Sequence, residues 1–300
     1  MRRPRITPLA LAGLPLMLAG CIVHVDSGGF TSRDQVRVAV EGVPTVDLST
    51  FDGAIEVRSW SKAEVLVEIE SRASSRDLLD TIDIDSRGDK SGAVVHVTLK
   101  DTDGWRFSKH AVSRSARLIA TVPAESRLRV NSGDGSVRVV RVRGTIEART
   151  DDGRIVMREV GGDVVAHTGD GSVQVEDVDG RCRVSTRDGS VLVAGRLQGG
   201  IEARSGDGSV TIRAASGTIV DEDWHIETGD GGVVLTLPDP VDARLDLETG
   251  DGRIALAGFP ELSVARDGER RRRLQAVLGD GQATLRVRTS DGTISLKRTP

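Results

Sequence analysis

The 300-residue chain is poor in the residues that build an ordinary globular core. It has three tryptophans, four phenylalanines and no tyrosine, so large rings cannot fill the interior. Its two cysteines, Cys21 and Cys182, are too few for a disulfide framework. A net charge of −4 without a dominant basic stripe argues against nucleic acid as a partner. Small and β-branched residues must therefore supply the core.

The N-terminus has the layout of an export signal. Three arginines lie within the first five residues and precede an apolar stretch, Ile6–Leu18. This stretch is shorter than the roughly 20 residues that a membrane span needs. Leu18-Ala19-Gly20-Cys21 then resembles the lipobox of bacterial lipoproteins. The resemblance implies that residues 1–20 are removed and that Cys21 is lipidated; an ordinary signal peptide is the alternative.

The residues after Cys21 suggest where the protein is held. Residue 22 is Ile and not Asp, which by the sorting habit that the lipobox resemblance implies favours the outer membrane. We expect residues 21–35 to form a lipidated polar tether. A lipid anchor on Cys21 makes the membrane itself a partner of the chain.

Asp-Gly pairs recur through the rest of the chain and mark a repeat. The first four of the regular series are 18 residues apart, and the next spacings are 19, 23 and 21 residues. Segments of alternating apolar and polar residues flank the pairs, as in half-buried strands. In the simplest interpretation Asp bonds its own backbone and Gly takes positive φ. The pairs begin at Asp134, Asp152, Asp170, Asp188, Asp207, Asp230, Asp251, Asp280 and Asp291.

Aligning the repeats predicts columns of inward residues with nearly equal size. Such columns suit stacked strands about 4.8 Å apart. We therefore predict an all-β fold in which residues 131–300 form a parallel β-solenoid, or β-helix, with rungs of 18–23 residues. The columns are Ile146, Val164, Cys182 and Ile201; Ala148, Ala166, Val184 and Ala203; Val137, Ile155, Val173, Val191 and Val210; and Val139, Met157, Val175, Val193 and Ile212.

An antiparallel arrangement is the alternative, because Asp-Gly between alternating strands is also typical of a β-hairpin. Soluble meanders of identical hairpins are rarer than solenoids at this period, which favours the parallel stack. Antiparallel pairing of the strands on either side of Asp170-Gly171 would exclude the solenoid.

Residues 36–130 are also strand-like, but their spacing is irregular. Asp52-Gly53 resembles an early degenerate rung, and Ser74–Asp80 is the only expected helical turn. We expect this region to cap the first edge of the solenoid, which would otherwise invite aggregation.

Residues 258–279 depart from the repeat and are predicted to be an inserted loop. This loop contains the arginine run 270–273, either as a solvated surface or as a contact for anionic lipid or an acidic envelope polymer. Leu285–Leu296 then restores one last rung.

Three features together resemble a known family. They are Ala120-Thr-Val-Pro-Ala124, the repeated Thr/Ser-Gly-Asp-Gly-Ser/Arg-Val/Ile units and the closing Thr289-Ser-Asp-Gly-Thr-Ile-Ser-Leu296. Over residues 36–298 the chain resembles the DUF4097 family of adhesin-like proteins with β-strand repeats. The resemblance implies a β-solenoid on an exported or membrane-associated protein, and it supplies no catalytic residues.

Few residues suggest chemistry. Stacked turns would align Asp134, Asp152, Asp170, Asp188 and Asp207, and such a column is a weak candidate for calcium. We expect these aspartates to be structural and predict no metal or other cofactor. The five histidines are scattered, His167 is expected at the surface, and Cys182 is expected in the core.

The sequence therefore predicts a non-catalytic scaffold or adhesin-like interaction protein of the cell envelope, with a protein or polysaccharide partner. The alternative is a carbohydrate-active β-helix that binds or cleaves acidic polysaccharides. The outward charges form no cluster that stands out from the repeat, and the three tryptophans are far apart, which favours the non-catalytic interpretation.

Overall fold

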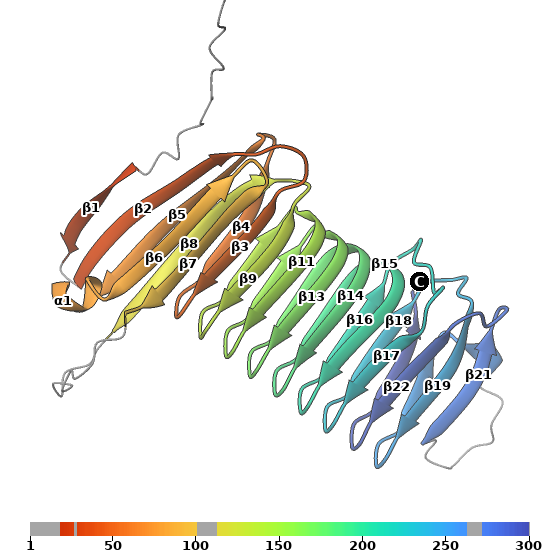
Figure 1. The fold of residues 1–300 in the computed structure, drawn as a ribbon. Helices are drawn as coiled ribbons and strands as arrows, with labels where there is room; N and C mark the ends of the chain where they lie inside the picture. The colour runs from red at the N-terminus through yellow and green to blue at the C-terminus, as the bar shows by residue number, and fades with distance from the viewer. Residues whose placement is uncertain (1–18, 27–28, 101–112, 263–271, 300) are drawn as a thin grey trace, which may run out of the picture.

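The chain folds into a long stack of short strands. The computed structural model describes residues 19–26, 29–100, 113–262 and 272–299, and the leader predicted at 1–20 lies almost wholly outside this part. The described residues contain 23 strands, the short helix α1 (Arg76–Leu79) and the 3₁₀ turn η1 (Pro260–Leu262). Figure 1 shows the strands as successive rungs along one axis, with a broader N-terminal end. The prediction of an all-β fold is confirmed.

The strands form two rows. The first row holds mainly the strands that precede the turns, and the second row those that follow them. In spatial order the first row is β6 (Ile82–Asp89), β7 (Gly92–Leu99), β3 (Thr45–Thr50), β9 (Arg127–Ser132), β11 (Arg143–Thr150), β13 (Gly161–Thr168), the ends of β14 (Val173–Thr186) and β15 (Val191–Ser205), β17 (Trp224–Thr228), β22 (Thr284–Thr289), β19 (Ala243–Thr249) and β21 (Arg273–Leu278).

The second row is built in the same way. Because β14 and β15 run from one row into the other, all the strands belong to one large sheet. In spatial order the second row is β1 (Ala19–Asp26), β2 (Gly29–Ala39), β5 (Glu64–Ala73), β8 (Arg114–Pro123), β4 (Ile55–Trp60), β10 (Val137–Val140), β12 (Ile155–Arg158), the starts of β14 and β15, β16 (Val210–Ala214), β18 (Val233–Leu237), β23 (Ile294–Arg298) and β20 (Ile254–Ala257).

Most pairings are parallel and join equivalent positions of neighbouring repeats. Ile146 stands beside Val164, which stands beside Cys182 on its other side. In the second row Val137, Ile155 and Val173 are in register in the same way. The predicted inward columns are buried along their whole length. Alternation of period two along each strand therefore places the correct face inward.

The antiparallel alternative is wrong for the repeats. β13 and β14 flank Asp170-Gly171, but β13 pairs with the far end of β14 and in parallel. The beginning of β14 pairs instead with β12, in the second row. The turn therefore moves the chain from one row to the other and does not fold it back on itself.

The turn glycines are required for a reason other than the one expected. The glycines of the regular Asp-Gly turns do not have positive φ. A Cβ on Gly171 would instead lie 2.0 Å from the carbonyl oxygen of Gly153, and one on Gly189 would lie 1.9 Å from that of Gly171. Each turn thus rests directly on the backbone of the turn before it.

The N-terminal end has the broad antiparallel cap visible in Figure 1. β2, β5 and β8 pair antiparallel, and β6 covers β7 in the same way. β3 and β4 form the degenerate rung at Asp52-Gly53, and they lie between the β7–β8 rung and the β9–β10 rung. The helical turn expected at Ser74–Asp80 is α1, which Ser75 caps by accepting from the Leu78 N–H.

Strands occupy most of the region 21–35, which the sequence predicts to be a polar tether. Residues 29–35 belong to β2 and pair with β5 from Phe30 to Ala39, and residues 19–26 form β1. Residues 31–35 are all polar, so this part of β2 lacks the alternation of apolar and polar residues that predicts a strand. They are tolerated because this end of β2 is partly open to solvent.

The C-terminal end also differs from expectation. Residues 273–278, placed in the inserted loop 258–279, form β21, which pairs antiparallel with β19. Residues 263–271 lie outside the described part. The rung at Leu285–Leu296 is not the last in space, because β22 lies between β17 and β19, and β23 lies between β18 and β20. The last rung in sequence, β22 and β23, therefore lies between two rungs that precede it in sequence: β17 and β18 on one side, and β19 and β20 on the other.

We predict that Gly171→Ala destabilises the stack by about 2–3 kcal/mol, because the new Cβ must displace the Gly153 carbonyl. Chemical denaturation followed by circular dichroism measures the change. Gly232→Ala is the matched control, since its Cβ would lie 3.3 Å from the nearest atom, the Thr293 carbonyl oxygen. Equal losses in both variants would contradict the steric role of the column.

Candidate functional site

The aspartates of the turns lie at the surface of the stack. Asp134, Asp152, Asp170, Asp188 and Asp207 are all exposed at the tips of successive turns. Asp170 makes an ion pair of 3.2 Å with Arg187 from the next turn. Among the described residues, no group of three or more His, Cys, Asp or Glu side chains has an arrangement suited to a metal ion. Calcium binding by the column therefore stays a sequence-based prediction.

A column of buried hydroxyl groups lies beneath these turns. Thr186 Oγ1 donates to the carbonyl of Gly171 at 2.7 Å and accepts from the N–H of Gly189 at 3.2 Å. Thr150 makes the equivalent contacts with Gly135 and Gly153. Sequence reasoning did not identify this role, although each affected strand ends in Thr or Ser three residues before the turn glycine. These hydroxyls satisfy turn backbone groups that would otherwise be buried without partners.

The outward face of the first row carries an alternating array of charges, here called the charged face. Its acidic and basic side chains pair across neighbouring strands, so that most of their charge is cancelled locally. Arg183 lies 2.9 Å from Glu202, and Arg204 bridges Glu202 at 2.7 Å and Glu227 at 3.7 Å. The charged face comprises Asp47, Arg129, Glu147, Arg149, Arg183, Glu202, Arg204, Glu227, Arg286, Arg288, Asp246 and Glu248.

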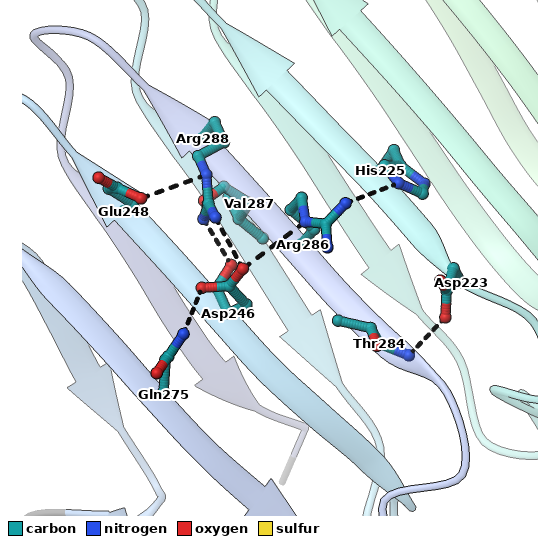
Figure 2. A network of polar contacts seen from close by, with 9 residues as sticks. All are labelled: Asp223, His225, Asp246, Glu248, Gln275, Thr284, Arg286, Val287 and Arg288. Atoms are coloured by element: carbon teal, nitrogen blue, oxygen red, sulfur yellow. Dashed lines mark hydrogen bonds and ion pairs between the residues drawn. The ribbon is translucent and has the colours of Figure 1, made fainter.

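Figure 2 shows the C-terminal part of the charged face, where Asp246 is central. The Arg288 guanidinium donates to its carboxylate at 2.7 Å and to its backbone carbonyl at 2.9 Å. Gln275 donates from β21 at 3.4 Å, and Arg286 lies at 3.6 Å. Glu248 is the second acidic partner of Arg288, at 3.4 Å. This network joins β21, β19 and β22, which are neighbours at the C-terminal end of the first row.

The environment of Asp246 stabilises its ionised form. Its side chain is only 15% exposed. The hydrogen bond from Arg288 lowers the pKa of the carboxyl group below its ordinary value of 3.8, aided by Gln275 and opposed by partial burial. The ionised carboxylate is thus bound by its arginine partners, and these contacts link β19 to β22.

Three further side chains, a cysteine, a histidine and a tryptophan, lie either in the core or at the surface of the stack. Cys182 is fully buried, as predicted, and burial raises the pKa of its thiol to about 12. His167 is exposed, as predicted, and contacts Ser185 at 2.8 Å. Trp224 is buried and donates to the Gly199 carbonyl. Trp105 lies outside the described residues, and for Cys21 only its place in β1 is described.

The outward face of the second row is less charged and contains a groove. The groove has a volume of about 490 Å³ and crosses β4, β10, β12 and β14. Its lining residues are Glu56, Ser136, Val137, Arg138, Arg154, Val156, Arg158 and Gln174, and it is called the arginine groove below. The sequence analysis did not find it, because only the strand register brings these residues together.

The parallel stack of two-row repeats defines a class of β-repeat protein, and the comparison with known families makes the assignment specific. The family model described as Toastrack DUF4097 matches residues 45–297. The chain therefore belongs to the DUF4097 Toastrack family. No protein in the curated set matches it.

Solved structures of bacterial proteins are similar at low sequence identity. A candidate adhesin from Bacteroides fragilis is 13% identical over 88% of this chain and 96% of its own, with a TM-score of 0.49. A candidate adhesin from Parabacteroides merdae is 12% identical over 88% and 95%, with a TM-score of 0.39. A candidate cell adhesion protein from Clostridium sporogenes is 13% identical over 89% and 100%, with a TM-score of 0.27.

We predict that the stabilising contribution of Asp246 depends on pH. Its pKa is lowered in the folded state, so the contribution is present above the ordinary value of 3.8 and is lost as pH falls below it. Asp246→Asn should therefore lower the free energy of unfolding by about 1 kcal/mol at pH 7 and by less at pH 2–3. Urea denaturation at several pH values measures this difference.

The control for this prediction is Asp207→Asn, on an exposed turn without an ion pair in the described part of the chain. Its effect should be small at every pH. A loss for Asp246→Asn that does not change between pH 7 and pH 2–3 would contradict the electrostatic explanation.

Proposed function

We propose that this chain is a non-catalytic interaction protein of the bacterial cell envelope, with an adhesin-like role. The observation that carries the proposal is the long stack itself, in which strands held in register present extended outward faces. Repeat proteins of this kind use such faces as binding surfaces. The interior of the described residues is filled mainly by aliphatic side chains.

We infer further that the two rows form a parallel β-solenoid capped at both ends. Three features support this assignment: the parallel register between successive repeats, the turns that pass the chain between rows, and the continuous buried columns. The antiparallel β2, β5 and β8 at one end and β21 at the other would close the edges.

Attachment through a lipid on Cys21 is part of the proposal. The lipobox-like Leu18–Cys21 supports it, and so does the position of Cys21 in β1, beside β2 at the edge of the cap. Because β2 pairs with β5 from Phe30 onward, almost no free chain separates the anchor from the folded cap. A protein tethered in this way would hold the first end of its stack against the membrane. In the described residues no helix has the length and apolar character to cross a bilayer.

The charged face favours binding over cleavage. A lyase or hydrolase would need carboxylates and basic groups that converge on a substrate, whereas Glu202 and Asp246 are engaged by Arg183, Arg204 and Arg288. Such paired groups can exchange partners with an incoming charged surface, which gives specificity more than affinity.

Replacing Cys21 with Ser should release a folded protein from the membrane fraction, because the thiol that carries the lipid is lost. Fractionation and metabolic labelling with a radioactive fatty acid measure attachment, and circular dichroism measures folding. Cys182→Ser is the control and should remain attached. Retention of the Cys21→Ser protein in the membrane fraction would overturn the lipoprotein proposal.

The released protein also tests the non-catalytic role. Incubation with acidic polysaccharides should yield no new reducing ends and no unsaturated products. Depolymerisation that is abolished by replacing outward acidic residues on neighbouring rungs would overturn that role in favour of a carbohydrate-active enzyme.

A further inference from the structure

The arginine groove lies on the outward face of the second row, opposite the charged face. Val156 of β12 is half-buried at its centre. Arg138 of β10 is in register with Val156 on one side, and Gln174 of β14 is in register with it on the other. Arg154 and Arg158 lie two residues before and after Val156 and so project to the same face. An apolar floor is thus surrounded by three guanidinium groups, one amide and the carboxylate of Glu56, which is in register with Arg138.

Two of the three arginines have no acidic partner in the described part of the chain. Arg158 pairs with Glu176 at 2.9 Å, and the lining residue Glu56 is engaged by Arg117 at 2.6 Å. Within the described residues, neither Arg138 nor Arg154 makes an ion pair, whereas every arginine of the charged face does. The groove is therefore locally cationic in a chain whose net charge is −4.

The repeat itself does not require these arginines. The residue that follows the turn glycine is serine at positions 136, 172, 190 and 209, and Arg154 replaces it in that series. In the column of Arg138, the next rungs carry Val156, Gln174 and Leu192. Stacking therefore proceeds without a cation at either position, so the fold itself does not require the pair; Arg253 after Gly252 is the equivalent of Arg154 in a later turn.

We propose that the arginine groove binds carboxylate groups of an acidic oligosaccharide, such as a chain of uronic acid residues. Guanidinium groups bind carboxylates through paired, planar hydrogen bonds, and Ser136 and Gln174 add donors and acceptors for sugar hydroxyls. The proposal rests on the proposed envelope role and names the class of partner for one face of the stack.

Two other partners fit the groove less well. A membrane surface is held by clusters of about four to eight basic residues, and only two free arginines are present here. A protein interface usually contains aromatic or methionine anchors, and none lines the groove. A polar ligand with spaced carboxylates matches both the charge and the open shape.

The test uses the mature protein in neutral detergent and oligogalacturonate as the probe, with isothermal titration calorimetry. The double variant Arg138→Gln/Arg154→Gln should weaken binding roughly tenfold or more, because two charge-assisted contacts are lost. The matched control is Arg213→Gln/Arg253→Gln. It removes two exposed arginines of the same row that lie outside the groove and make no ion pair with another described residue. Binding by the control should remain within about twofold of the unaltered protein.

Three results would overturn the proposal. The first is the absence of oligogalacturonate binding by the unaltered protein, and the second is an equal loss in both double variants, which would indicate unspecific attraction. The third is groove-dependent binding to phosphatidylglycerol vesicles without binding to the oligosaccharide. None of these results would return the Cys21→Ser protein to the membrane fraction or give it hydrolytic activity, so failure of the groove remains distinguishable from failure of the envelope role.

Discussion

The close approach of backbone to backbone at the glycine turns is the constraint on which the stack depends. Gly153, Gly171 and Gly189 succeed one another with no space for a Cβ, and a Thr hydroxyl beneath each turn binds the glycine carbonyl of the preceding one. This contact fixes the register of both rows at once. Because register decides which residues face inward, a slip of one residue would bury arginine and expose valine.

The two ends of the stack differ from its middle, where every strand has a neighbour on both sides. Open edges invite further pairing, and here antiparallel strands form three of the four row ends, β1, β6 and β21, whereas β20 ends the second row in parallel. β3 lies between β7 and β9, and β22 lies between β17 and β19. Unravelling from the C-terminus must therefore break pairings on both sides of β22 and β23, and the hydrogen bond from Arg288 to Asp246 reinforces the pairing of β22 with β19.

The inward columns could be predicted because period two is local, and the repeat aligns equivalent residues without knowledge of the fold. The insertion of β22 could not be predicted from the sequence. Its alternation of apolar and polar residues is the same as that of any other rung, and its position depends on pairing with strands distant in sequence. β21 and residues 29–35 were assigned to loop and tether because polar residues at partly open edges weaken alternation. The arginine groove could not be predicted either, because it depends on the register of four neighbouring strands. The lipobox is local and remains a sequence-based prediction.

The parallel register across a turn is tested most directly by cysteine cross-linking. His167 and Ser185 are in register on neighbouring rungs and face outward, whereas Gln174 lies in the other row. A short bifunctional thiol reagent should join His167→Cys to Ser185→Cys and fail to join His167→Cys to Gln174→Cys, with the buried Cys182 unreactive in both. Efficient linkage of 167 to 174 without linkage of 167 to 185 would show a hairpin at Asp170-Gly171 and contradict the stack.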